Sequence, residues 1–447
     1  MQKRIQLSDH FTTGRLLRFV APSIVMMIFT SIYSVVDGLF VSNFAGKDPF
    51  AALNLIYPYI QAFGCLGFML GTGGSALVAM TVGLGDRDKA NRLFSMLTLA
   101  TVLLGGIATV LALALLRPAA ILLGAEGELL ELAVLYGAIC LAFQIAFMLQ
   151  YFFQSFLIMA EKPRLGLLFT ISAGCTNMVL DFVFVGLWDW GLAGAAGATV
   201  LSQVVGGIGP ALYFMRPDNG SLLHFVRPQR ADWRLLGQAC ANGSSELMSN
   251  LSNSLVSALY NWQLLRLAGT DGVAAYGVIM YLSFIFAAVF IGYAQGSAPI
   301  VSYHYGAAHA DELHNLLRKS LGLVAAGGIA MLAAAEALAG PLARIFVGYD
   351  AGLMDLTTSA LRLYALSYLL CGFNIWGSAF FTALNDGVTS AALSFLRTLL
   401  FQVAAVLLLP LVLGTAGIWL SITVAECAAL LMLAGFLAAK RSTYHYF

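Results

Sequence analysis

The chain has 447 residues, of which 60% are hydrophobic and only 10% are charged, and its formal net charge is +1. A soluble protein would carry about 25% charged residues, so the composition excludes a soluble globular protein. It predicts a polytopic membrane protein with almost no extramembrane domain. The near-zero net charge and the lack of a large basic cluster argue against nucleic-acid binding.

Apolar segments long enough to cross a bilayer, which takes about 20 residues, recur along the whole chain. Twelve are expected, at approximately 16–43, 52–80, 93–116, 128–158, 165–187, 193–215, 238–266, 273–303, 320–340, 355–383, 390–413 and 416–438. Several are longer than a straight crossing needs, which indicates tilt or kinks.

The basic residues of the connections indicate the orientation. If residue 1 is cytoplasmic, 18 of the 23 Lys and Arg residues fall in inner connections and five in outer ones. The positive-inside rule then places both termini in the cytoplasm. The expected location is the cytoplasmic membrane of a bacterium or archaeon. The protein is expected to contact membrane lipid and to function as a monomer.

The two halves of the sequence repeat. A shift of 223 residues lays FAGKDPFAA (44–52) on LAGTDGVAA (267–275), and it also matches Gly73 to Gly296, Gly83 to Gly306 and Gly191 to Gly414. Six crossings in each half are an even number, so both halves insert in the same direction. The predicted fold is all-α, with twelve transmembrane helices as two six-helix bundles related by a pseudo-twofold axis along the membrane normal. The expected boundaries are residues 1–217 for the N-terminal lobe, 218–233 for a cytoplasmic linker and 234–447 for the C-terminal lobe.

The repeat breaks where the first half carries acids. Under the same shift Asp37 becomes Tyr260, Asp181 becomes Ala404 and Asn177 becomes Leu400. A carboxylate inside a transmembrane segment costs about 2.5–3.5 kcal/mol even on a lenient insertion scale, and such residues are usually functional. A symmetric scaffold with asymmetric charge predicts that one lobe holds the coupling chemistry.

Three of these polar residues are expected at a similar depth. Asp37, Asp181 and Thr199 each lie five or six residues from the predicted outer end of a helix, which is roughly 9 Å at 1.5 Å per residue. Asn177 lies one helical turn before Asp181, on the same face. Carboxylate, amide and hydroxyl oxygens suit Na⁺, and without an ion two neighbouring aspartates would share a proton. We therefore predict a Na⁺ or H⁺ site at Asp37, Asn177, Asp181 and Thr199.

These residues resemble a known family, the multidrug and toxic compound extrusion (MATE) transporters. The resemblance covers the whole chain and rests on Asp37 within VDGLFVSNFAG, on NMVLDFVFV (177–185), on GLAGAAGATVLSQ (191–203), and on Pro22 and Tyr33. It implies that the first-lobe aspartates, with the asparagine and threonine, bind Na⁺ or H⁺, and that protonation is linked to bending of the first helix. Pro22 and Gly38 are the expected flex points. Ser254, where one subgroup has a glutamate, argues against a second-lobe ion site.

The cargo is expected to contact a set of polar and aromatic residues, namely Tyr33, Gln154, Gln203, Glu246 and Glu426. For Glu246 an interfacial cap or a partner for Arg234 is an equal alternative. For Glu426 the alternative to an interlobe or cargo-contacting acid is a buried structural bond.

The predicted function is secondary active export of amphiphilic, often cationic, organic compounds by alternating access, without a cofactor. A neighbouring alternative is a flippase for a lipid-linked sugar, which would need a strongly basic cavity. An integral-membrane transferase would need His/Asp or Asp-rich clusters at a membrane face, which the sequence does not show.

Overall fold

The computed structural model describes residues 5–216, 220–227 and 232–446. This part of the chain is almost entirely helical and contains no strand. The first half comprises α1 (Thr13–Phe40), the π-helical segment η1 (Val41–Ala45), α2 (Lys47–Gly83), α3 (Arg87–Leu122), α4 (Gly127–Ala142), α5 (Gln144–Met159), α6 (Pro163–Asp181), the π-helical segment η2 (Phe182–Leu187) and α7 (Gly191–Met215). The second comprises α8 (Trp233–Gly306), α9 (Ala310–Val347), α10 (Ala351–Ala365), α11 (Tyr368–Ala383), α12 (Gly387–Phe395), the π-helical segment η3 (Leu396–Phe401), α13 (Gln402–Leu413) and α14 (Thr415–Tyr444).

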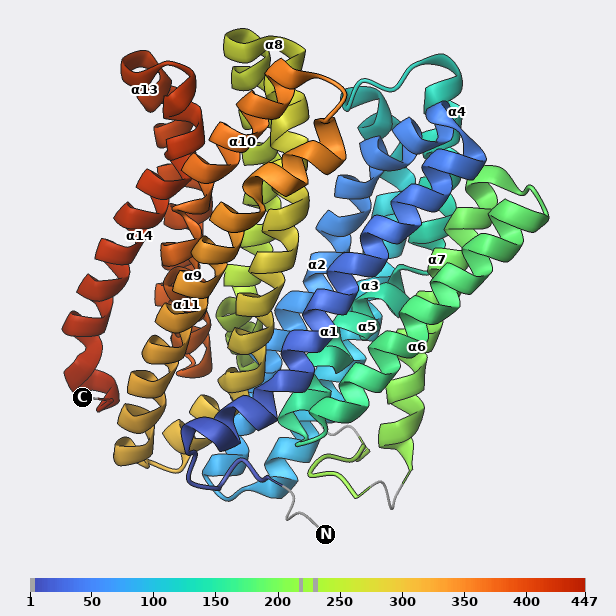
Figure 1. The fold of residues 1–447 in the computed structure, drawn as a ribbon. Helices are drawn as coiled ribbons and strands as arrows, with labels where there is room; N and C mark the ends of the chain where they lie inside the picture. The colour runs from blue at the N-terminus through green and yellow to red at the C-terminus, as the bar shows by residue number, and fades with distance from the viewer. Residues whose placement is uncertain (1–4, 217–219, 228–231, 447) are drawn as a thin grey trace.

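The predicted twelve crossings are confirmed. Within the described ranges, nine helices are long and apolar enough to cross a membrane, and two bent pairs, α4–α5 and α10–α11, bring the number to eleven. Helix α8 has 74 residues, roughly 110 Å at 1.5 Å per residue, far more than the ~30 Å of a bilayer core. Its non-helical residue Gly269, at φ 64° and ψ −155°, turns the chain back (Figure 1), so α8 supplies two crossings.

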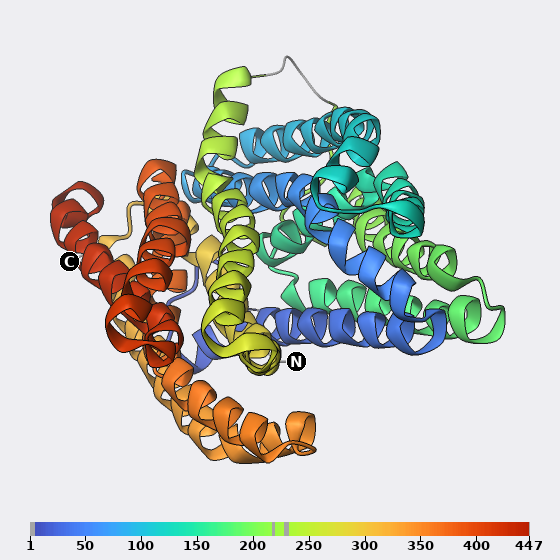
Figure 2. The same ribbon diagram turned by 90° about the horizontal axis from the view of Figure 1, so that it is seen from above.

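Elements α1–α7 lie on one side of the molecule and α8–α14 on the other (Figures 1 and 2). The backbone turns repeat between them. Gly46 and Gly269 both have positive φ (101° and 64°), as do Gly191 and Gly414 (54° and 59°), and each pair is separated by the 223-residue offset. Positive φ favours glycine, because a residue with a Cβ atom would be strained in that conformation. The sequence repeat is therefore a repeat of turns.

The contacts between the halves repeat as well. Gly83 of α2 lies against the backbone of Tyr303 in α8, and Gly306 of α8 lies against the backbone of Met80 in α2. Met80 and Tyr303 are themselves one repeat apart, so the same contact is made twice, once in each direction. Such reciprocity is the mark of a twofold axis. A second reciprocal pair is Gly73 on Gly243 and Gly296 on Val20.

Gly83 and Gly306 are the last residues of α2 and α8, and these helix ends lie at the end of the bundle that holds both termini, here called the termini side (Figure 1). Because Gly83 and Gly306 end their helices at the same side, the axis runs along the helices and not across them. A methyl group at Gly73, Gly83 or Gly306 would overlap the facing backbone, and one at Gly296 would overlap Val20 Cβ. The halves are therefore packed backbone to backbone on the termini side.

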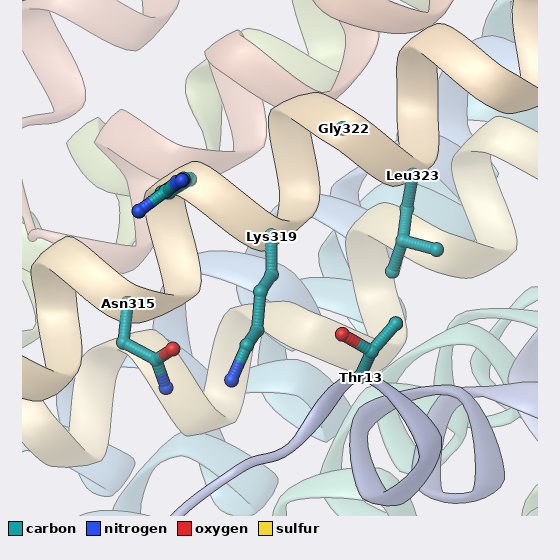
Figure 3. Close-up of a pocket in the computed structure, with 6 residues that line it drawn as sticks. Thr13, Asn315, Lys319, Gly322 and Leu323 are labelled. Atoms are coloured by element: carbon teal, nitrogen blue, oxygen red, sulfur yellow. The ribbon is translucent and has the colours of Figure 1, made fainter.

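Residues 5–12 connect the two halves on that side. The Leu7 N–H donates to Glu161 Oε1 (2.8 Å), between α5 and α6, and the Phe11 N–H donates to Glu312 Oε1 (2.9 Å) of α9. Lys319 Nζ donates to the Phe11 carbonyl oxygen (2.6 Å), and its side chain extends from α9 toward Thr13 at the start of α1 (Figure 3). The N-terminal segment is thus hydrogen-bonded to both halves.

The predicted fourth and tenth segments are not continuous helices. The first is α4 and α5, bent by 56°, and the second is α10 and α11, bent by 45°. The bends fall at Phe143, between α4 and α5, and at 366–367, between α10 and α11, almost one repeat length apart. Neither site carries a proline, the residue that usually marks a kink in a sequence.

Candidate functional site

Asp37 and Asp181 both lie beside a change in helix type. Asp37 is four residues before η1, and Asp181 is the last residue of α6, directly before η2. The helices that carry them, α1 and α6, pack together, and η1 contacts η2. Single π-helical turns inside α-helices are frequent at functional sites because they shift the side chains that follow. The local structure thus brings the two aspartate-bearing turns side by side.

The polar oxygens of this site lack protein partners. The Asp181 side chain is buried (0% exposed) and Asn177 nearly so (2%). Among the described residues, neither Asp181 oxygen has a hydrogen-bond partner, and the same holds for Asp37 Oδ1, Asn177 Oδ1 and Thr199 Oγ1. A buried polar atom without a partner costs free energy, and each such atom in a native protein needs an explanation.

The two carboxyl groups lie close enough to act on each other electrostatically, and Asp37 also lies near the Asn177 amide. Two ionised carboxylates can only accept hydrogen bonds, so neither can satisfy the other unless one of them carries a proton. Tyr136 of α4 lies near both Asp37 and Thr199, which places Thr199 of α7 in the same neighbourhood. The structure thus brings Asp37, Asn177 and Asp181 close together, with Thr199 in the same neighbourhood. Their donor set of carboxylate, amide and hydroxyl oxygens fits either a proton or a hard cation.

Tyrosines surround this centre. Tyr33 interacts with Asp37 and with Gln150, and Tyr57 interacts with Asp37, Tyr33 and Tyr151. Sequence reasoning selected Tyr33 and missed Tyr57, Tyr136 and Tyr151. A phenol in the middle of an apolar segment was the available signal, because a tyrosine hydroxyl in apolar surroundings usually needs a partner; of these residues Tyr136 is fully buried, whereas Tyr57 is 41% exposed.

Gln154 and Gln203, both predicted to contact cargo, are 7% exposed, and the Oε1 atom of each has no partner among the described residues. Gln154 lines a narrow space with Gln150, Gly206 and Pro210. These residues belong to α5 and α7, so Gln154 points into the first half and not across the boundary with the second.

Glu246 continues the contact surface between the halves. It lies one turn beyond Gly243, which packs against the Met69 backbone, and its carboxylate interacts with Cys65 of α2, one turn before Met69. Glu246 is partly exposed, and Arg397 of η3 acts on it electrostatically. This acid therefore lies between the halves, just past their backbone-to-backbone packing.

Glu426 is placed differently from its predicted role as an interlobe or cargo acid. It is 1% exposed and forms an ion pair with Arg397, whose Nη2 lies 2.8 Å from Oε1. Arg397 Nε also donates to Oε1 (2.9 Å) and Oε2 (3.0 Å), and Asn374 Nδ2 donates to Oε2 (2.6 Å). Both oxygens are occupied inside the second half, which is the alternative of a buried structural bond. The positive-inside count places Arg397 among the inner connections. In the structure it lies within the crossing formed by α12, η3 and α13.

Comparison with known proteins matches the model of one family, MatE, to residues 22–183 and again to residues 247–407. The two matched stretches are separated by almost the repeat length found above. The chain belongs to the MatE family. It is therefore a multi-pass membrane transporter of a multidrug efflux family and not an enzyme, which excludes the transferase alternative.

Relatives and solved structures agree with this placement. The chain is 21% identical over 432 residues to the multidrug export protein MepA of Staphylococcus saprophyticus, covering 96% of this chain and 94% of that one, and 19% identical over 430 residues to MepA of Staphylococcus aureus. A MATE family multidrug resistance transporter in an outward-facing conformation superimposes with a TM-score of 0.93 at 23% identity, over 100% of both chains. A transporter of the MOP superfamily from Pyrococcus furiosus, described as having a binding pocket of reversed polarity, gives 0.90 at 23% identity over 99% of both.

Proposed function

We propose that this MatE protein exports amphiphilic, often cationic, organic compounds in exchange for Na⁺ or H⁺. The observation that carries the proposal is the cluster of buried oxygens on Asp37, Asn177, Asp181 and Thr199 that have no hydrogen-bond partner among the described residues. A bound cation or proton would supply the missing partner and neutralise the carboxylate pair. The same cluster would be unfavourable as a purely structural element.

The packing of the halves supports a cycle of alternating access. The reciprocal glycine contacts close the termini side, which the positive-inside count assigns to the cytoplasm. In this arrangement the ion site would be reached from the opposite side. Binding of the ion would let α1, flexing at Pro22 and Gly38, repack toward α6 and α7 and release cargo outward. The return to the cytoplasm-facing state would require the glycine contacts to separate.

The flippase alternative needs free basic groups to hold a pyrophosphate. Arg397 is a basic residue of the second half that lies near Glu246, and its guanidinium is already paired with Glu426. The Asp181 carboxylate has no hydrogen-bond partner among the described residues, whereas Arg397 is paired with Glu426. This distribution of charge favours a cationic cargo.

The test is transport by purified protein in liposomes under separately imposed Na⁺ and pH gradients. Asp37→Asn and Asp181→Asn keep the side-chain shape and remove the charge, so each is expected to abolish gradient-driven export of an organic cation. The double variant should be little worse than either single one, because the two residues act as one site. Asp271→Asn, at an exposed position, is the matched control. Near-normal coupled flux in both single variants would refute the proposal.

A further inference from the structure

Three charged residues of the second half, Glu246, Arg397 and Glu426, bear on which charge the cargo carries. Glu426 is buried and Arg397 is 16% exposed at its side chain, whereas Glu246 is partly exposed between the halves. The three residues come from α8, η3 and α14, so the fold brings them together and the sequence does not.

Arg397 neutralises one of the two acids. Its guanidinium makes three contacts of 2.8–3.0 Å with the Glu426 carboxylate, and a bidentate pair of this kind is strong and geometrically specific. Asn374 fixes Glu426 further, because its Nδ2 donates both to Oε2 (2.6 Å) and to the Glu426 backbone oxygen (2.9 Å). The pair contributes no net charge.

Glu246 is the residue of the three whose charge is not cancelled by an ion pair. Arg397 also favours its ionised form electrostatically, and with Glu246 ionised the three residues together carry one negative charge. Glu246 faces Cys65 across the boundary, one turn past the packed glycines. A cation bound between the halves would therefore meet a single uncompensated carboxylate from the second half.

We infer that Arg397 is a specificity-determining residue, which by neutralising Glu426 makes Glu246 the one carboxylate that the second half presents and so selects cargo with a single positive charge. The inference rests on the proposed function for the identity of the site as a cargo site. It requires no gradient, because selection by charge is a property of binding.

The experiment measures equilibrium binding of ethidium and propidium to detergent-solubilised protein by fluorescence. The two dyes share one ring system and carry one and two positive charges. Arg397→Gln leaves Glu426 uncompensated and is expected to raise the propidium-to-ethidium affinity ratio on the order of tenfold, the effect of one added charge at short range. Arg397→Gln/Glu426→Gln restores the net charge and should return the ratio to the wild-type value. Glu246→Gln should weaken binding of both dyes, and of propidium more.

Several results would overturn the inference. One is an unchanged ratio in folded Arg397→Gln protein. If that variant does not fold, the comparison between the double variant and Glu246→Gln decides, since both replace charges by neutral side chains of similar shape. Equal loss of dye binding in the two would show that Glu246 does not carry the charge alone. Failure of the proposed function would appear separately, as wild-type liposomes that bind dye but show no gradient-driven flux.

Discussion

Gly83 and Gly306 occupy equivalent positions in the two halves, and each packs against the backbone of the other's helix, Gly83 at Tyr303 and Gly306 at Met80. A reciprocal contact of this kind needs only one kind of surface, used twice. It also makes the closed termini side sensitive to volume, because the facing atoms are backbone and cannot rotate away.

Replacing either glycine should therefore open the termini side. Gly83→Val and Gly306→Val are each expected to destabilise the closed arrangement by about 1–3 kcal/mol, the usual cost of overpacking, and to do so to a similar extent. Accessibility of a cysteine introduced beside the contact, measured by thiol labelling, reports the change. Gly106→Ala is the control, because a methyl there meets nothing within 4 Å. Unchanged labelling in both valine variants would contradict the role of this contact.

Much of the fold could be predicted from the sequence because its causes are local or periodic. Hydropathy marks the crossings, and the glycines at 46, 191, 269 and 414 recur because the turns they form need positive φ. The same reasoning placed Asp37, Asp181 and Thr199 at one depth with Asn177 one turn away, and the structure brings Asp37, Asn177 and Asp181 close together.

The features that the sequence did not predict arise from contacts between distant segments. The ion pair of Arg397 with Glu426 joins residues 29 apart on different helices, so no periodicity indicates it. The bends at Phe143 and 366–367 lack proline, and the partners of the N-terminal segment, Glu161 and Glu312, lie 154 and 301 residues away.

The neutral oxygens of the proposed ion site offer a second prediction. Asn177→Leu and Thr199→Val each remove one oxygen and leave both carboxylates, so the coupling ion should bind more weakly without loss of the maximal rate. The loss of one buried polar partner is about 1–3 kcal/mol, or roughly 5- to 150-fold in ion affinity. Transport rate measured against Na⁺ concentration and against pH gives the value. A lower maximal rate at unchanged ion affinity would contradict a ligand role.

Acid stability should depend on Asp386, which lies between α11 and α12. Burial alone would raise the pKa of its carboxyl, but hydrogen bonds from Lys440 and Thr389 hold that pKa below its ordinary value. A lowered pKa in the folded state means that the carboxylate stabilises the protein above the ordinary carboxyl pKa of about 3.9 and ceases to do so as pH falls through the folded value. Thermal unfolding from pH 7 to pH 3 should therefore show a steeper loss for the wild type than for Asp386→Asn. Parallel curves would show that this ion pair does not contribute.

The last prediction concerns Gly38, next to Asp37 in α1. A methyl group at this position would lie 3.6 Å from Phe50 Cε2, an ordinary van der Waals contact, so Gly38→Ala should fold normally. Alanine favours the helix by about 1 kcal/mol over glycine, which should hinder the flexing that the proposed cycle requires. We expect thermal stability equal to or above that of the wild type, unchanged ethidium binding and a several-fold slower export rate. Gly106→Ala makes the same exchange in α3, where a methyl meets nothing within 4 Å, and should leave the rate unchanged. Equal slowing in both variants would point to a general effect of helix rigidity, and wild-type export by Gly38→Ala would show that α1 does not flex at this residue.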